Sequence, residues 1–369
     1  MLSAMGWRRS KRSRLSVVVP LYNLAHTLPA CLASVLEQPV RDIEVVVVDD
    51  GSRDDSADVA ERIAAADARV RVIRQANGGV SRARNAALAA CTGDLVTFVD
   101  PDDVLPQDAW RPLLRSLART GSDFAVGMME RVDATGRRTR PPLLARNHAS
   151  ARAATTIDES PLLIADVFPC NKIFRLDFWR GAGLSFPVDT DYEDQVMATE
   201  AFLKARSFDV LTEVVYEWHT REDLSSATQR RAQLRNLEDR IRTKQVSLDM
   251  VRHYGNDELT RIFYTEVLPI DMWEHFRAAV APTTPDPDRY WQVLREGLIG
   301  IWNDATFRFE ESRVPVGQRL MGWLVEKDRR ADLARLIAQI DGEGVPVVDG
   351  TYRHPWIDEP GLPEALQNA

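Results

Sequence analysis

The feature that most restricts the fold is a regular alternation of strand-like and helix-like segments over the first third of the 369-residue chain. Ile43–Val48 is an almost continuously apolar run, which is typical of a parallel strand covered on both faces. Leu15–Pro20, Val70–Ile73 and Leu95–Val99 are further short apolar runs, and helical patterns separate all four. Parallel strands joined by helices form a doubly wound α/β domain, which we expect from Leu15 to about Thr120.

The later part of the chain changes in character. We expect a strand at Ser122–Val132, a polar loop over 134–156, a helix at Tyr192–Ala205 and a strand at Phe208–Trp218. Beyond Ala227 the periodicity of apolar residues indicates long amphipathic helices. These helices are expected at about 234–255, 259–279, 290–302, 317–325 and 331–340. Glycine and proline dominate from residue 341, which predicts an irregular tail.

Composition and charge exclude several classes of protein. The formal net charge of -8 argues against general nucleic-acid binding, which depends on basic surface. Cys31, Cys91 and Cys170 form no CxxC pair, so neither a disulfide framework nor a zinc site is indicated, and a reducing compartment fits. No apolar run approaches the roughly 18 residues that a membrane-spanning helix needs. We therefore expect a cytoplasmic protein.

Residues 1–14 form a basic leader rich in arginine. Such a leader could lie against anionic lipid, where each basic residue near the surface contributes about 1 kcal/mol. We expect instead a solvated, disordered segment, although peripheral association with the inner face of a membrane is compatible with the sequence. A homo-oligomer is compatible with it too.

Polar residues follow three of the predicted strands, at Pro20–Asn23, Asp49–Ser52 and Asp100–Asp103. The carboxyl ends of parallel strands meet at one edge of the sheet, where ligands of open α/β domains bind. A ring stacked near Tyr22, beside Asn23, and an acid at Asp49 that accepts from a base N–H would together recognise a nucleotide. The sequence therefore predicts a nucleotide site at this edge.

The third of these strand ends reads Asp100-Pro101-Asp102-Asp103. Carboxylate oxygens suit hard cations such as Mg²⁺ and Mn²⁺, and an ion held by one or two of them keeps positions for a diphosphate. Aspartate and proline are also ordinary turn residues. This stretch alone is compatible with a turn and with a metal site.

A phosphate-binding segment is predicted next to these strand ends. Asn77 and two glycines lead into a helix N-terminus, followed by Arg82 and Arg84. Arginine pairs with phosphate oxygens, and the start of a helix adds backbone donors. The alternative nucleotide sites lack their motifs: the chain has no GxxxxGK[ST] and no GxGxxG after the first strand.

Four segments, VVVPLYN, VVVVDDGSRDDS, NGGVSRARNAAL and VDPDD, resemble in order and spacing the family 2 glycosyltransferases of the GT-A fold. The resemblance is strong over about 15–105 and looser to about 227. It implies that Pro20, Tyr22 and Asp49 line the nucleoside. It also implies that Asp100 lies by the ribose and that Asp102 binds the metal that bridges the diphosphate.

The resemblance extends to an acceptor half of the site. Asp194 matches the acid that takes the proton from the acceptor hydroxyl, a role that needs a carboxylate because a hydroxyl is a poor nucleophile. Glu193 precedes it, and an alternative is that both acids only complement a helix dipole. Lys172 resembles a lysine that the family carries upstream of this pair. His219 and Arg221 resemble a loop that folds over the diphosphate in members acting on cell-surface polymers.

The domain prediction follows from these observations. It comprises the leader (1–14), a GT-A domain (15–227) with nucleotide-binding (15–120) and acceptor (121–227) halves, a helical domain (228–340) and the irregular tail (341–369). The helical extension resembles that of members associated with teichoic-acid or capsule polymers.

The functional hypothesis is a metal-dependent inverting glycosyltransferase, of the hexosyl- or N-acetylhexosaminyl-transferase type. It would use Mn²⁺ or Mg²⁺, a nucleotide-diphosphate sugar, foremost a UDP-sugar, and a polymer or glycan acceptor of the cell envelope. Two alternatives are a nucleotidyltransferase acting on a sugar phosphate and an inactive nucleotide-sugar-binding module. Intact Asp102 and Asp194 count against the inactive module.

Overall fold

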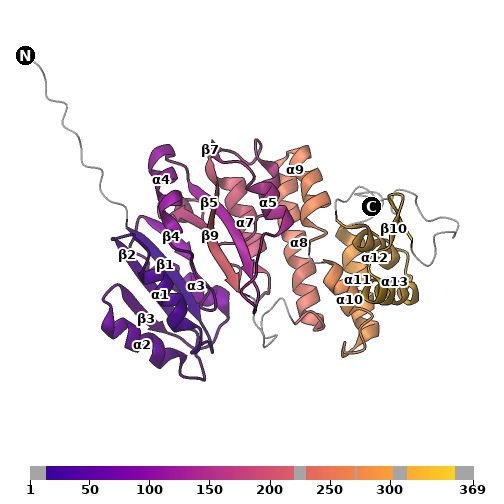
Figure 1. Ribbon diagram of the computed structural model, residues 1–369, viewed down its shortest axis with the longest axis horizontal. Coiled ribbons are helices and arrows are strands. Elements are labelled where there is room, and N and C mark those ends of the chain that lie inside the picture. Colours follow the sequence, from indigo (N-terminus) through magenta and orange to yellow (C-terminus); the bar gives the residue numbers. More distant parts are fainter. Residues whose placement is uncertain (1–13, 220–229, 271, 302–313, 354–369) are drawn as a thin grey trace, which may run out of the picture. The chain divides into compact units, whose positions relative to one another are not determined.

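The computed structural model describes residues 14–219, 230–270, 272–301 and 314–353 (Figure 1). They form two compact units. The first, here called the sheet unit, comprises the described residues within Met1–Thr156, Phe168–Asp189 and Lys204–Thr220. The second, the helical unit, comprises those within Ile157–Val167, Thr190–Leu203 and Arg221–Ala369. The segment that carries Glu193 and Asp194 thus packs with the C-terminal helices.

The sheet unit contains a nine-stranded, mostly parallel sheet in the described residues. Along most of the sheet the order is β3-β2-β1-β4-β8-β5-β9-β7, with β6 paired to β5. The first four strands, all parallel, are β1 (Leu15–Leu21), β2 (Ile43–Asp49), β3 (Val70–Arg74) and β4 (Leu95–Phe98). The others are β5 (Phe124–Val132), β6 (Arg138–Thr139), β7 (Arg152–Thr155), β8 (Lys172–Arg175) and β9 (Phe208–His219). The predicted fold class is confirmed.

The helices of the sheet unit follow the predicted alternation. They are α1 (Leu28–Leu36), α2 (Ser56–Ala66), α3 (Val80–Ala90), α4 (Trp110–Thr120), α5 (Pro142–Asn147) and α6 (Leu176–Gly181). Every residue of β1, β2 and β4 is buried, as the continuous apolar runs indicated. Helix α1 begins at Leu28, and Pro29 suits its first turn.

Strand β8 was not predicted. It runs antiparallel between β4 and β5, and it begins at Lys172, a residue type that is rarely buried. The Lys172 side chain is 1% exposed and donates from Nζ to Phe168 O (2.6 Å) and Asn171 Oδ1 (3.0 Å). Elements β6, α5 and β7 likewise occupy the segment that was expected to be a loop.

The helical unit begins with the 3₁₀ helix η1 (Pro161–Ala165) and α7 (Glu193–Lys204), whose last residue belongs to the sheet unit. Its C-terminal elements are α8 (Leu234–Tyr254), α9 (Asp257–Ile262), the π-helix η3 (Phe263–Val267), α10 (Met272–Ala278), α11 (Pro287–Ile301), α12 (Val316–Glu326) and α13 (Arg330–Glu343). Gly255 ends α8 with φ 83°, a value that glycine adopts without strain. A short hairpin, β10 (Val347–Val348) and β11 (Thr351–Tyr352), lies in the expected irregular tail. In the described part of the chain, no helix is long and apolar enough to span a membrane.

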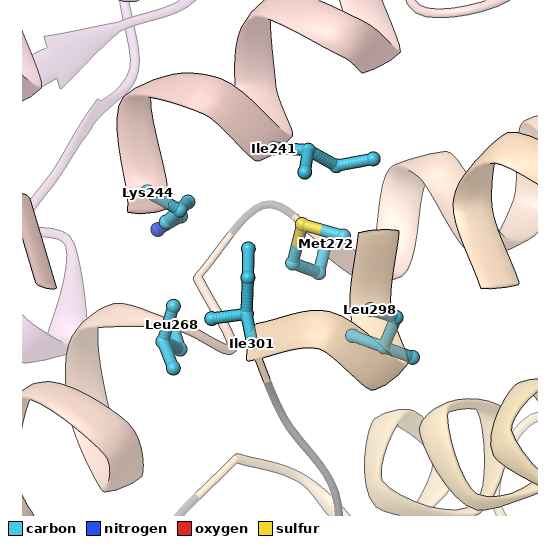
Figure 2. Close-up of a pocket in the computed structure, with 6 residues that line it drawn as sticks. All are labelled: Ile241, Lys244, Leu268, Met272, Leu298 and Ile301. Carbon is cyan, nitrogen blue, oxygen red and sulfur yellow. The ribbon is translucent and has the colours of Figure 1, made fainter. Parts of the chain in front are cut away.

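A small apolar cavity lies inside the helical unit (Figure 2). It is lined by Ile241, Lys244, Leu268, Met272, Leu298 and Ile301. Its volume of about 10 Å³ leaves room for about one water molecule, so it cannot hold a sugar or a nucleotide. The Lys244 ammonium donates to Val267 O, which satisfies a charged group among apolar neighbours.

Candidate functional site

The carboxyl ends of β1, β2, β4 and β9 lie at one edge of the sheet. Strands β1, β2 and β4 are parallel. Strand β8 is antiparallel to both β4 and β5, so β5 runs in the same direction as β4. Strand β9 is parallel to β5 and therefore shares that direction. The predicted residues lie at or just after the ends of these strands: Pro20–Asn23, Asp49, Asp100–Asp103 and His219. The sheet therefore brings together the predicted donor-site segments, as the sequence indicated.

The end of β2 is tied to the segment that precedes α3 by Asp50, a residue that we had not assigned a role. Its carboxylate accepts from Gly78 N (2.9 Å), Gly79 N (2.7 Å) and Gln75 Nε2 (2.6 Å), while its carbonyl accepts from Asn77 Nδ2 (2.9 Å). The carboxylate and carbonyl oxygens of Asp50 therefore hold the loop of residues 75–79 against the end of β2. The preceding Asp49 is 4% exposed, and its Oδ1 accepts from Ser52 N at 3.3 Å.

Gly51 shows why this loop needs glycine. It has φ 72°, and a Cβ at this position would lie 2.9 Å from Asn77 N. A side chain would therefore separate the two segments that Asp50 joins. The acid-then-glycine pattern after a buried strand, followed downstream by Asn77 and two glycines, was the signal that could have identified Asp50 as their anchor.

The loop after β1 is hydrogen-bonded to the loop after β2. Asn23 has a left-handed φ of 51°, its N–H donates to Ser52 Oγ (3.0 Å) and its Oδ1 accepts from Arg53 N (2.7 Å). Pro20 is buried, whereas Tyr22 is 40% exposed. An exposed aromatic ring on a fixed loop provides a surface on which a planar base can stack.

Two arginines of α3 differ in their surroundings. Arg84 is 3% exposed, and its guanidinium donates to Asp100 Oδ1 (2.9 Å) and lies 5.0 Å from the centre of the Phe186 ring. Arg82 pairs with Asp189 at 2.8 Å, and both side chains are more than half exposed. Arg84 thus holds an acid of the site in place, while an exposed pair like that of Arg82 costs little to break.

Tyr216, a fully buried residue of β9, organises the acidic turn after β4. Its hydroxyl donates to Asp103 Oδ2 (2.8 Å) and accepts from Asp100 N (3.0 Å). Asp103 also accepts from His219 N (2.7 Å) and is 2% exposed. Burial, together with the charges of Asp102 and Asp100, raises the pKa of Asp103 well above its usual value. Sequence reasoning gave Tyr216 no role and counted Asp103 only as one of the acids of the turn.

Asp102 lies between these two anchored acids and is partly exposed. Its oxygen donors suit Mg²⁺ or Mn²⁺, which need few protein ligands when a diphosphate supplies others. The pKa of Asp103 is raised first by burial and then by the negative charges of Asp102 and Asp100, which a cation would offset. The described residues contain no group of three or more histidines, cysteines or acids arranged to hold a metal. The turn fits a metal that is shared with a ligand.

The remaining predicted residues lie on other elements. Lys172 is buried in β8, as described above. The His219 ring is partly exposed, with Nε2 3.8 Å from Glu217 Oε2, and Arg221 lies outside the described residues. Glu193 and Asp194 begin α7 in the helical unit, where Glu193 is 8% exposed and Asp194 is partly exposed.

Comparison with known proteins agrees with this geometry. Residues 16–180 match the family described as Glycosyl transferase family 2. An uncharacterized glycosyltransferase EpsJ of Bacillus subtilis is 31% identical over 65% of this chain and 70% of its own length. A putative glycosyltransferase EpsH of the same organism is 31% identical over 58% of this chain and 63% of its own length.

Two further proteins extend the comparison. A poly(ribitol-phosphate) beta-glucosyltransferase of Bacillus spizizenii is 27% identical over 57% of this chain, which spans a third (33%) of that protein. The crystal structure of S. aureus TarS 1-349 in complex with UDP-GlcNAc superposes with a TM-score of 0.69 at 19% identity, covering 95% of this chain and 98% of TarS 1-349. This likeness shows the fold.

The sheet order and the likeness to TarS show the GT-A fold. The chain belongs to glycosyltransferase family 2. Its membership favours sugar transfer over the nucleotidyltransferase alternative.

Proposed function

We propose that the protein transfers a hexose or N-acetylhexosamine from a UDP-sugar to a hydroxyl group of a cell-envelope polymer. The observation that carries this proposal is the turn after β4, where Arg84 anchors Asp100, Tyr216 anchors Asp103, and Asp102 lies partly exposed between them. A relative that glucosylates poly(ribitol phosphate) and a UDP-GlcNAc complex of a protein with this fold support the donor and the polymer class.

In this proposal the strand ends bind the nucleotide. Tyr22 stacks on the base, while Pro20 and Asp49 line the nucleoside. Asp100 receives the ribose hydroxyls, because Arg84 fixes the orientation of its carboxylate. The backbone around Asn77 and the N-terminal turn of α3, with Arg82 able to leave its exposed pair, face the phosphates. Asn23 fixes the loop after β1 through the hydrogen bond from its N–H to Ser52 Oγ.

Asp102 would hold a divalent cation in this site. The cation would stabilise the negative charge that develops on the departing nucleoside diphosphate. His219, at the end of β9, and Arg221 would add positive charge beside the same leaving group. Asp103 and Tyr216 keep the turn in one conformation and need not contact the donor.

Asp194 is proposed as the general base. It would take the proton from the acceptor hydroxyl as that oxygen attacks the anomeric carbon opposite the leaving diphosphate, so the configuration of the sugar would invert. Glu193 and Lys172 are proposed to support the acceptor side. Peripheral attachment to a membrane through the basic leader concerns residues outside the described range, apart from Arg14.

A panel of nucleotide sugars tests the function. UDP-glucose and UDP-N-acetylglucosamine are offered with Mn²⁺ or Mg²⁺ and with poly(ribitol phosphate), and release of UDP is measured. In Asp194→Asn, transfer should fall by about 10²–10⁴ while calorimetric donor affinity stays constant. Glu193→Gln is the matched control and should be milder. Donor binding with no turnover of any panel member would instead favour the inactive binding module.

A further inference from the structure

Helix α8 buries an unusual stripe of polar side chains in the helical unit. Its residues repeat at intervals of three and four, so they share one face of the helix: Asn236, Asp239, Arg240, Thr243, Lys244 and Ser247. Each is at most 3% exposed. Burying polar groups costs free energy unless partners satisfy them, so the stripe requires polar neighbours.

The N-terminal end of this stripe binds Asp191, three residues before the proposed base. The Asp191 N–H donates to Asp239 Oδ2 (3.0 Å), and Asn236 Nδ2 donates to Asp191 Oδ2 (2.8 Å). Arg230 lies 3.7 Å from the other oxygen of the same carboxylate. Main chain and side chain of Asp191 are thus both fixed by residues from outside α7.

Tyr192 is fixed by the same face of α8. Its hydroxyl donates to Asn236 Oδ1 (2.8 Å), and the Arg240 guanidinium lies over its ring, 4.5 Å from the centre. The ring also packs edge-on against His275 of α10, at a centroid distance of 6.4 Å. Tyr192 has φ 64°, a left-handed conformation that costs a residue with a side chain of order 1–3 kcal/mol and persists only where the surroundings enforce it.

This strained residue lies directly before α7. The Tyr192 carbonyl accepts from Gln195 N (3.2 Å), so the conformation of Tyr192 sets the direction of the first helical turn, which carries Glu193 and Asp194. We propose that α8 is a positioning element for the catalytic acid: Asn236, Asp239 and Arg240 hold Asp191 and Tyr192, and through them orient Asp194. This inference rests on the proposed role of Asp194 as the base.

The proposal gives the helical extension a part in catalysis. These side chains do not contact the reacting atoms in this scheme; they act through the backbone of 191–193. Misplacing a reacting group by about 1 Å costs on the order of 10²-fold in rate. Loss of part of the α8 contacts should therefore lower turnover by about tenfold, without weakening donor binding.

Asn236→Ala in the full-length chain is the principal test, because Asn236 bonds both Asp191 and Tyr192. Gln245→Ala is the matched control, since it removes a hydrogen bond to Asp249 on an exposed face of the same helix. UDP release from UDP-glucose and UDP-N-acetylglucosamine, with poly(ribitol phosphate), should fall about tenfold in Asn236→Ala and stay unchanged in the control. Tyr192→Phe keeps the ring and loses only the hydroxyl, so it provides a milder variant if Asn236→Ala does not fold.

A double-mutant cycle separates positioning from general destabilisation. In an Asp194→Asn background, the second substitution should change the residual rate by less than about twofold, because the group being positioned has already been removed. An equal loss in both backgrounds, or a matching loss of UDP binding, would overturn the proposal. If Asp194→Asn itself retains wild-type transfer, the assignment of the base has failed instead.

Hydrogen exchange provides a readout that does not depend on activity. Amides at the start of α7, including that of Gln195, should exchange faster in Asn236→Ala and Tyr192→Phe than in the wild-type protein and in Gln245→Ala. Unchanged exchange of these amides in both Asn236→Ala and Tyr192→Phe would show that α8 does not hold this turn.

Discussion

Replacement of Tyr216 by phenylalanine examines how the sheet unit builds the acidic turn. The change keeps the buried ring but deletes a hydroxyl that joins β9 to Asp103 and to the backbone of Asp100. A hydrogen bond to a charged group contributes about 1.5–3 kcal/mol, and an unsatisfied buried N–H costs about 1–3 kcal/mol. We therefore expect the free energy of unfolding to fall by about 3 kcal/mol, with relaxation of the turn absorbing part of the loss.

The assay combines urea unfolding, followed by tryptophan fluorescence, with calorimetric titration of UDP. Affinity for UDP in the presence of Mn²⁺ should fall about tenfold, because Asp102 is then carried by a less constrained turn. Tyr22→Phe is the control for stability: it also removes a tyrosine hydroxyl, but from a side chain that is 40% exposed. Wild-type stability and wild-type UDP affinity in Tyr216→Phe would refute the view that β9 anchors this turn.

Three further predictions concern the metal and the opposite edge of the sheet. Excess chelator should abolish sugar transfer, Mn²⁺ or Mg²⁺ should restore it, and Asp102→Asn should weaken calorimetric donor binding while leaving the urea midpoint unchanged; full activity in chelator would exclude the cation. Gly93→Ala should lower the free energy of unfolding by about 1–3 kcal/mol, because a Cβ there would lie 2.6 Å from Ser16 Oγ and 2.7 Å from Arg14 O. Burial tends to raise the pKa of Glu44, but hydrogen bonds from Ser16 and Thr92 bring it below the ordinary 4.5. The ionised Glu44 therefore stabilises the fold above pH 4.5, and this contribution is lost as the pH falls through the lowered pKa. Glu44→Gln should remove the contribution of Glu44 to the fall of the urea midpoint at acid pH. An unchanged dependence of the urea midpoint on pH in this variant would contradict the prediction.

The sequence predicted the parts of the structure that depend on local patterns. The apolar runs located β1 to β4, and their polar ends predicted one edge with Asp49, Asp100 and Asp102. These predictions succeed because a parallel strand buried on both faces leaves a strong local signal. Strand β8 left no such signal, because Lys172 is buried through bonds that only the folded chain supplies.

The supports of the site come from distant segments, which explains why they could not be predicted. Tyr216 is 113 residues from the acid it contacts, and its tyrosine hydroxyl has no local pattern that distinguishes it from an ordinary strand residue. Asn236 and Asp239 likewise lie in a helix whose apolar periodicity predicts packing alone, yet they bond a residue 45 and 48 positions away. The proposed chemistry rests on the motif residues, and these long-range contacts hold the segments that carry them.

The long-range contacts also bear on the role of the helical extension. Apolar periodicity after Ala227 suggested a support module separate from the catalytic domain, but α7 packs in the same compact unit as α8 to α13. Tyr192 has a left-handed φ, which persists only where the surroundings enforce it, and its hydroxyl donates to Asn236 of α8. In the proposed positioning scheme, one face of α8 serves the orientation of Asp194. Substitutions at Asn236 should accordingly affect turnover, while those at exposed positions of the same helix should affect neither turnover nor donor binding.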